Sequence, residues 1–269
     1  MSSKYIKFTC WLSIAVVIGV LLSLVGPGAI DNPVALADSP GAGPASWPIE
    51  AKNENPTVLP PNSNAFGKSY GEWSAAFWKW LYSMPTDAHP LFETADCSQS
   101  QSGKVWFLGG TFVVAETDTG VVEGTADRDC EVPTGTALFF PIVNLECDEF
   151  AGDGTTEEEL RACAHKYGDL IDVADLSAEI DGVKIDNLQA YRVDSPLFEW
   201  GPLPENNVQG TEAGTTSLAV GDGYYLLLAP LPPGEHTIDF IGRIVIPEFN
   251  LDFRLDIHYD IIVKPGPKK

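Results

Sequence analysis

Residues 251–263 read LDFRLDIHYDIIV, and this stretch decides the fold class of the chain. Large apolar residues stand at every second position, and charged or polar residues fill the positions between them as far as Asp260. Successive side chains of a β-strand point to opposite faces of its sheet, so the alternation predicts a strand with one buried and one solvated face.

Shorter apolar runs extend this pattern over most of the chain, and glycine or proline turns separate them. Asp181-Gly182 is a strong hairpin signal, Gly109-Gly110 has the composition of a tight hairpin turn, and Pro232-Pro233-Gly234 marks another turn. Further strands are predicted at residues 105–108, 112–115, 137–143, 178–180, 183–185, 188–193, 224–229 and 235–241, and a long polar loop at 202–223.

Two helices are expected among the strands. Ser69 and Glu72 form a capping box before an aromatic stripe at helical spacing, which predicts a helix over 69–82. Thr155 and Glu158 fit a second capping box, before a helix at about 157–172. Many short strands without regular strand–helix alternation predict a mainly all-β fold, an antiparallel β-sandwich that is either jelly-roll or immunoglobulin-like, with two short helices.

The N-terminal residues predict export. Lys4 and Lys7 precede an apolar run at 8–25, and Ala35-Leu36-Ala37 supplies small residues at a cleavage site, so residues 1–37 are expected to be a signal peptide and not a transmembrane anchor. A Pro/Ser/Asn-rich lead-in at 38–66, a domain at 67–264 and a tail at 265–269 follow. We therefore expect a secreted, periplasmic or cell-surface protein without stable membrane insertion after cleavage.

Four cysteines follow the predicted cleavage site: Cys97, Cys130, Cys147 and Cys163. An even number in an exported protein indicates disulfides, and we favour Cys97–Cys130 and Cys147–Cys163 because each would close a local excursion around core strands. No pair has the C-x-x-C spacing that thiolate metal sites favour.

The formal net charge of −22 narrows the range of partners. Binding to phosphates needs a basic surface, so the charge argues against nucleic acid and against docking on an anionic membrane. A cationic partner, bound Ca²⁺, saline surroundings or simply a well-solvated surface all fit such a charge.

Glu146, Asp148, Glu149 and Asp153 surround Cys147 and are the candidate functional carboxylates. Paired carboxylates could hydrolyse glycosidic or ester bonds, or could bind Ca²⁺ through Asp148 and Asp153, although the spacing is not that of an EF-hand. No other cofactor is indicated. We expect a binding cleft near Arg128, Glu146 and Asp148.

Three other features have residue types that occur in functional sites. Trp78 lies off the apolar stripe of the first helix and is the candidate exposed aromatic for stacking on sugars, whereas its neighbours are expected in the core. Ser69 matches G-x-S-x-G, but residues 59–64 cannot be the strand that this motif requires. His258 lies between Asp256 and Asp260 on a wet strand face, where the negative field favours its protonated form.

Residues 73–81 read WSAAFWKWL, residues 105–110 read VWFLGG, and residues 128–144 read RDCEVPTGTALFFPIVN. Together with Cys97 and Cys147, these segments resemble a family of exported microbial proteins of unassigned activity. The likeness covers about residues 66–263. It implies export and a single compact domain, and it carries over no catalytic residue.

The sequence thus favours a secreted, acidic, disulfide-stabilised binding or surface-associated module over an enzyme, with a polysaccharide or envelope component as its ligand. The alternatives are a secreted hydrolase that uses the carboxylates near Cys147, and a Ca²⁺-stabilised structural protein.

Overall fold

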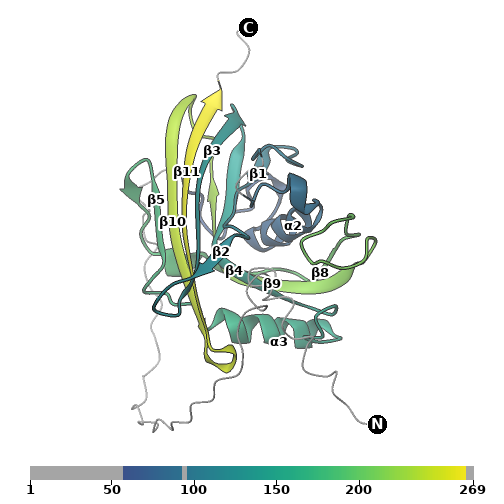
Figure 1. Ribbon diagram of the computed structural model, residues 1–269. Helices are drawn as coiled ribbons and strands as arrows, with labels where there is room; N and C mark the ends of the chain where they lie inside the picture. Colours follow the sequence, from purple (N-terminus) through teal and green to yellow (C-terminus); the bar gives the residue numbers. More distant parts are fainter. Residues whose placement is uncertain (1–56, 93–95, 265–269) are drawn as a thin grey trace, which may run out of the picture.

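Two packed β-sheets and two α-helices make up the computed structural model, which describes residues 57–92 and 96–264 (Figure 1). The predicted sandwich is confirmed. The predicted signal peptide, residues 38–56 of the lead-in and the tail lie outside the described residues. The α-helices are α2 (Tyr70–Tyr82) and α3 (Glu157–Gly168). The short 3-10 helices are η1 (Ala65–Gly67), η2 (Thr86–Ala88), η3 (Leu188–Tyr191) and η4 (Pro247–Phe249). The strands are β1 (Val105–Phe107), β2 (Val114–Glu116), β3 (Val122–Pro133), β4 (Ala137–Asp148), β5 (Ser177–Ile180), β6 (Val183–Lys184), β7 (Arg192–Asp194), β8 (Phe198–Trp200), β9 (Ser217–Leu228), β10 (Gly234–Ile246) and β11 (Leu251–Lys264).

The six-stranded sheet has the order β2-β3-β11-β10-β5-β6. Its strand β11 is the one predicted from the alternation in 251–263, and its odd-numbered residues are buried as expected. β10 pairs with it antiparallel, from Gly234 opposite Val263 to Ile246 opposite Leu251. In Figure 1 these long strands, with β3, form the wall on the left of the molecule.

Strand β3 was not predicted from the sequence, because its inward-facing positions carry small or charged residues. Gly124, Ala126, Arg128 and Cys130 are buried there, so no alternation of large apolar side chains is visible. β3 pairs with β11 in parallel, and β1 pairs with β4 in parallel. Both sheets are therefore mixed and not purely antiparallel.

The predicted hairpin at Gly109-Gly110 is wrong. β1 belongs to the five-stranded sheet and β2 to the six-stranded sheet, so the segment between them crosses from one sheet to the other. A Cβ at Gly109 would lie 3.2 Å from Leu91 Cδ2, and one at Gly110 would lie 3.0 Å from Leu255 Cδ1. Close packing, and not turn conformation, explains these glycines.

The five-stranded sheet has the order β1-β4-β9-β7, and β8 pairs with β9 as well. β4 contains the predicted buried run, and a register shift lies between Pro141 and Val143. α2 covers one face of this sheet. On the opposite face, Phe140 stacks on Phe240 of the six-stranded sheet and Cys147 bonds to Cys163 of α3.

The local predictions needed smaller corrections. The second capping box is Thr156 with Glu159, one residue later than predicted, and α3 ends at Gly168. β9 begins at Ser217, inside the predicted long loop, and η3 occupies the first part of the predicted strand at 188–193. The Ser69–Glu72 capping box is confirmed, and so is the hairpin at Asp181-Gly182, where both turn residues have positive φ.

Both predicted disulfides, Cys97–Cys130 and Cys147–Cys163, are present. Disulfides of this kind are typical of proteins that fold in an oxidising, extracytoplasmic compartment. Within the described residues, no helix combines the length and the apolar character needed to cross a bilayer.

Candidate functional site

Glu146 and Asp148 form a buried carboxyl pair near the end of β4. They are two residues apart on one strand, so both side chains point to the face that α2 covers, whereas Cys147 points to the other face. Their exposed fractions are 2% and 0%. The structure thus brings together two of the predicted site residues, and encloses both.

Neutral hydrogen-bond donors surround the buried carboxyl pair. The Tyr82 hydroxyl donates to Glu146 Oε1 over 2.9 Å, and the Gln209 amide nitrogen donates to the Tyr82 hydroxyl over 3.1 Å. Asp148 Oδ1 accepts hydrogen bonds from the Ala151 amide at 2.7 Å and from Ser217 Oγ at 3.2 Å. The pair therefore ties α2 and the segment 201–216 to β4.

The electrostatics of this group disfavour two free negative charges. Burial, followed by the neighbouring Asp148 carboxylate, raises the pKa of Glu146 well above its ordinary value of 4.5. Burial, followed by the charge of Glu146, likewise raises the pKa of Tyr82. The charged residues that act on Glu146 are two carboxylates, Asp148 and Asp153. The pair therefore needs a proton or another cation.

Aromatic side chains close the site, and one of them corrects a prediction. Trp78, expected to be exposed, is buried and stacks on Tyr82 with ring centroids 5.9 Å apart. Trp200 also packs on Tyr82, with ring centroids 4.9 Å apart. Trp78 is thus a packing residue of α2 in this structure, and it offers no open face for a sugar.

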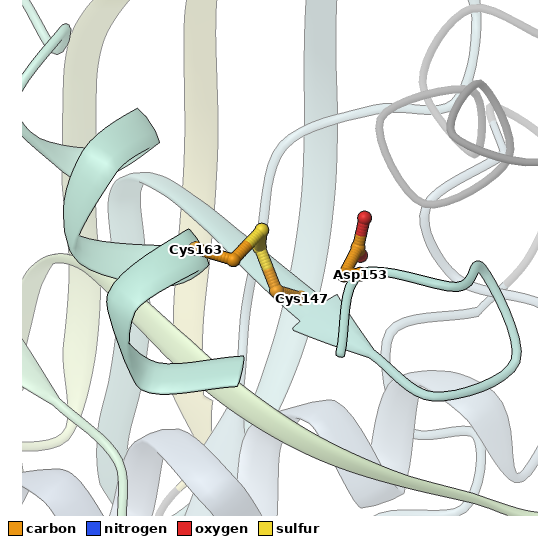
Figure 2. A group of neighbouring side chains, drawn as sticks. All are labelled: Cys147, Asp153 and Cys163. Atoms are coloured by element: carbon orange, nitrogen blue, oxygen red, sulfur yellow. A yellow bond between two sulfur atoms is a disulfide. The ribbon is translucent and has the colours of Figure 1, made fainter. Parts of the chain in front are cut away.

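The other two carboxylates near Cys147 differ in their relation to the pair: the charge of Asp153 acts on Glu146, whereas Glu149 points to solvent. Glu149 is exposed. Asp153 accepts a hydrogen bond from the Asp148 main-chain N–H and lies beside the disulfide between Cys147 and Cys163 (Figure 2). Since the two sulfur atoms are bonded to each other, these cysteines offer no thiolates to a metal ion.

Arg128 lies apart from the buried carboxyl pair and has a structural role. It is buried, and its guanidinium donates to the carbonyls of Gly110 at 2.9 Å and Leu91 at 3.2 Å and to the Tyr259 hydroxyl at 3.0 Å. Through these bonds, Arg128 connects the segment that crosses from one sheet to the other with Tyr259 of β11. The structure therefore does not bring Arg128 together with Glu146 and Asp148 in the predicted cleft.

A second polar group lies on the outward-facing side of the six-stranded sheet, which we call the outer face. The pairing registers place Asp127 of β3, His258 of β11, Asp239 of β10 and Glu179 of β5 in one row across four strands. His258 Nδ1 lies 2.6 Å from Asp239 Oδ1, and Asp260 lies beside the other ring nitrogen at 3.5 Å. These carboxylates raise the pKa of His258, the Asp239 hydrogen bond most of all.

Ser69 acts as a helix cap. Its hydroxyl accepts a hydrogen bond from the Glu72 amide and donates to the Glu72 carboxylate, and among residues 57–68, which the structure describes, no named strand leads into it. This is the structural role that the capping box predicted, and it leaves the G-x-S-x-G match without the context of a nucleophile.

Sequence reasoning missed Tyr82, Gln209, Asp127 and Asp239 as members of these groups. Tyr82 reaches Glu146, and Gln209 reaches Tyr82, only through tertiary packing, for which the sequence carries no local signal. Asp127 was hidden because β3 was not predicted, and Asp239 because pairing register cannot be read from one strand. No known protein-family profile matches the chain, and no curated protein is significantly similar to it.

Proposed function

We propose that this protein is an exported binding module whose outer face holds a cationic partner, an amine-bearing polysaccharide of a cell envelope. Two observations outside the outer face support export: the predicted signal peptide and the two disulfides. The acidic composition, with a net charge of −22, supports a partner of the opposite charge.

The single observation that carries the proposal is the carboxylate array on the outer face. Strands β3, β5, β10 and β11 place their outward-facing acids on one face of the six-stranded sheet. These acids are Glu123, Asp127, Asp129, Glu131, Glu179, Glu235, Asp239, Asp252, Asp256 and Asp260.

The basic side chains of the outer face are already engaged. Arg254 pairs with Glu123 and Asp256, and Lys264 pairs with Glu131. Arg243 likewise bonds to carboxylates, on Asp252 and Asp175. The carboxylates that remain produce a negative electrostatic field, which is centred on the row through His258. This field suits the regularly spaced amines of a polymer.

The buried carboxyl pair gives less support to a hydrolase. A general acid or nucleophile has to approach the bond that it cleaves, and Glu146 and Asp148 are enclosed by α2, β9 and the segment 201–216. The outward-facing acids of the outer face, in contrast, are half-buried or exposed in the part of the chain that the structure describes.

Calorimetric titration with oligomers of glucosamine, at low salt and about pH 6, tests the proposal. The N-acetylated oligomers are the matched ligand, because they keep the sugar backbone and lose the positive charge. We expect binding of the amine form only, and weakening as salt screens the charges. Equal binding of both forms would contradict the proposal.

Matched variants locate the surface. The triple variant Asp127→Asn, Asp239→Asn, Asp260→Asn is expected to lose about tenfold or more in affinity, because it removes charge from the centre of the array. The triple variant Glu199→Gln, Glu205→Gln, Glu212→Gln changes the net charge equally at exposed positions on β8 and in the segment 201–216, and should bind as the wild type does. Equal losses in both would show that only net charge matters.

A further inference from the structure

Three side chains with metal-ligating atoms meet on the outer face: Asp127, His258 and Asp260. One ligand atom of each lies within 4.8 Å of the other two. The pairing of β3 with β11 sets Asp127 directly opposite His258. Asp260 is two residues further along β11, so its side chain points to the same face as that of His258. The three ligands therefore come from the regular part of the sheet and not from a loop.

The imidazole of His258 is held in the orientation of a metal ligand. Its Nδ1 lies 2.6 Å from Oδ1 of Asp239, and this carboxylate accepts the hydrogen of Nδ1. The lone pair of the neutral ring is then on Nε2, the nitrogen beside Asp260. Histidines that bind metals almost always donate their second ring N–H to a carboxylate, a carbonyl or water, which fixes the tautomer. Asp239 supplies this contact.

The distance between His258 and Asp260 suits a shared ion. His258 Nε2 and Asp260 Oδ1 are 3.5 Å apart. This is longer than the usual hydrogen bond of about 2.7–3.2 Å. Two ligands at about 2.0–2.2 Å from a tetrahedral Zn²⁺ ion lie about 3.4 Å from each other. Asp127 and Asp260 are exposed and His258 is half-buried, so an ion can reach these atoms from solvent.

The set of donor atoms selects the class of ion. One imidazole nitrogen with two carboxylate oxygens suits Zn²⁺, which binds nitrogen and oxygen ligands in tetrahedral geometry. Ca²⁺ takes about six to eight oxygen ligands, so a cluster of acids alone would favour Ca²⁺. The imidazole at the centre of this group favours Zn²⁺ instead.

We propose that Asp127, His258 and Asp260 form a Zn²⁺ site on the outer face, in which Asp239 orients the imidazole. Three protein ligands leave a fourth position for water or for a group of a ligand. The site goes beyond the proposed function and does not depend on it, because the ion binds these side chains without any polysaccharide. Zinc was not expected from the sequence, since Asp127 joins His258 only through the pairing of β3 with β11.

Calorimetric titration with ZnCl₂ tests the site, with the untagged full-length protein treated with chelator and dialysed to neutral pH. No oligosaccharide is present, so the result is independent of amine binding. We expect one bound zinc ion per chain. CaCl₂ at the same concentrations is the control, because Ca²⁺ is attracted by the acids but is a poor partner for imidazole. The absence of zinc binding, or equal affinities for both ions, would overturn the proposal.

Variants assign the ion to this site. His258→Gln should weaken zinc binding by about tenfold or more, and Asp239→Asn, which removes the orienting carboxylate, by about tenfold. His165→Gln is the matched control, because it removes an exposed imidazole of α3 that lies 3.5 Å from Asp194, and it should bind zinc as the wild type does. Unchanged affinity in His258→Gln, or an equal loss in His165→Gln, would overturn the assignment.

NMR of the ring nitrogens separates ligation from a structural effect of the variants. In the wild type, zinc should shift the signal of His258 Nε2 more than that of Nδ1, because Asp239 holds Nδ1. A larger shift of Nδ1 would overturn the role of Asp239. Should His258→Gln fail to fold, Asp127→Asn on the neighbouring strand decides, and wild-type affinity in this variant would overturn the site.

Discussion

The hydroxyl of Tyr82 donates a hydrogen bond to Oε1 of Glu146 over 2.9 Å, at a point where both residues are buried. Tyr82 is the last residue of α2, and Glu146 lies near the end of β4. This bond therefore fixes the C-terminal end of the helix on the five-stranded sheet, and it gives Oε1 of Glu146 a neutral donor.

Tyr82→Phe should lower the free energy of unfolding by about 1–3 kcal/mol, because it leaves a buried carboxyl oxygen without its donor. Urea denaturation measures this change. A double-mutant cycle with Glu146→Leu, which removes the acceptor, isolates the pair, and we expect a coupling energy well above the scatter between independent sites. Additive effects of the two substitutions would show that the bond contributes nothing specific.

Stability should fall as the pH rises above about 4.5, the ordinary pKa of a glutamate side chain. Burial and Asp148 raise the folded-state pKa of Glu146 above its ordinary value of 4.5. As the pH rises, the unfolded chain therefore loses the Glu146 proton before the folded protein does. The stabilisation that this proton gives the folded protein is complete below the unfolded-state pKa and is lost as the pH rises towards the folded-state pKa.

The variant Glu146→Gln separates this effect from other titrating groups. His236 and His258 also have raised pKa values, and they lose stabilisation over the upper part of the same range. Both histidines are present in the variant, so the difference between the two pH profiles belongs to Glu146. Parallel profiles for wild type and variant would contradict the assignment.

Removing the Trp78 side chain should lower the free energy of unfolding. Trp78→Ala is expected to cost about 3–5 kcal/mol, because the side chain is buried against Tyr82 and its loss leaves a cavity. Lys79→Ala, at the adjacent exposed position of α2, should change stability by about 0.5 kcal/mol or less. Near-native stability of Trp78→Ala would mean that the indole is not packed as described.

The two disulfides should differ in their contributions to stability. The Cys97–Cys130 bridge spans 33 residues and Cys147–Cys163 spans 16, so the chain-entropy argument gives about 4 and 3 kcal/mol respectively. Paired Cys→Ser variants, unfolded in urea under non-reducing conditions, measure both values. The reverse order, with the shorter bridge contributing more, would show that packing around α3 outweighs loop closure.

The predictable parts of this fold are those where side-chain pattern and burial coincide. β11 could be predicted because large apolar and charged residues alternate along it, and the capping box at Ser69 because it is a local contact. β3 escaped prediction because its inward side includes glycine and Arg128, and the crossing at Gly109-Gly110 because close packing and turn formation favour the same residue type.

Only some residues of the candidate sites could be predicted from the sequence, for a related reason. Their closeness to Cys147 in the sequence was sufficient to group Glu146 and Asp148 with Glu149 and Asp153. That the first two lie on β4 and are buried depends on α2 and the segment 201–216, which come from distant parts of the chain. Likewise, His258 was recognised beside its sequence neighbours, while Asp127 and Asp239 reach it only through pairing register.

Mapping the ligand by NMR tests the central claim most directly. On titration with glucosamine oligomers, the account predicts that amide shifts concentrate on the outward-facing residues of β3, β10 and β11, with the largest changes around Asp127, Asp239 and His258. Shifts that concentrate instead on α2 and the segment 201–216, or that spread evenly over the acidic surface, would contradict it.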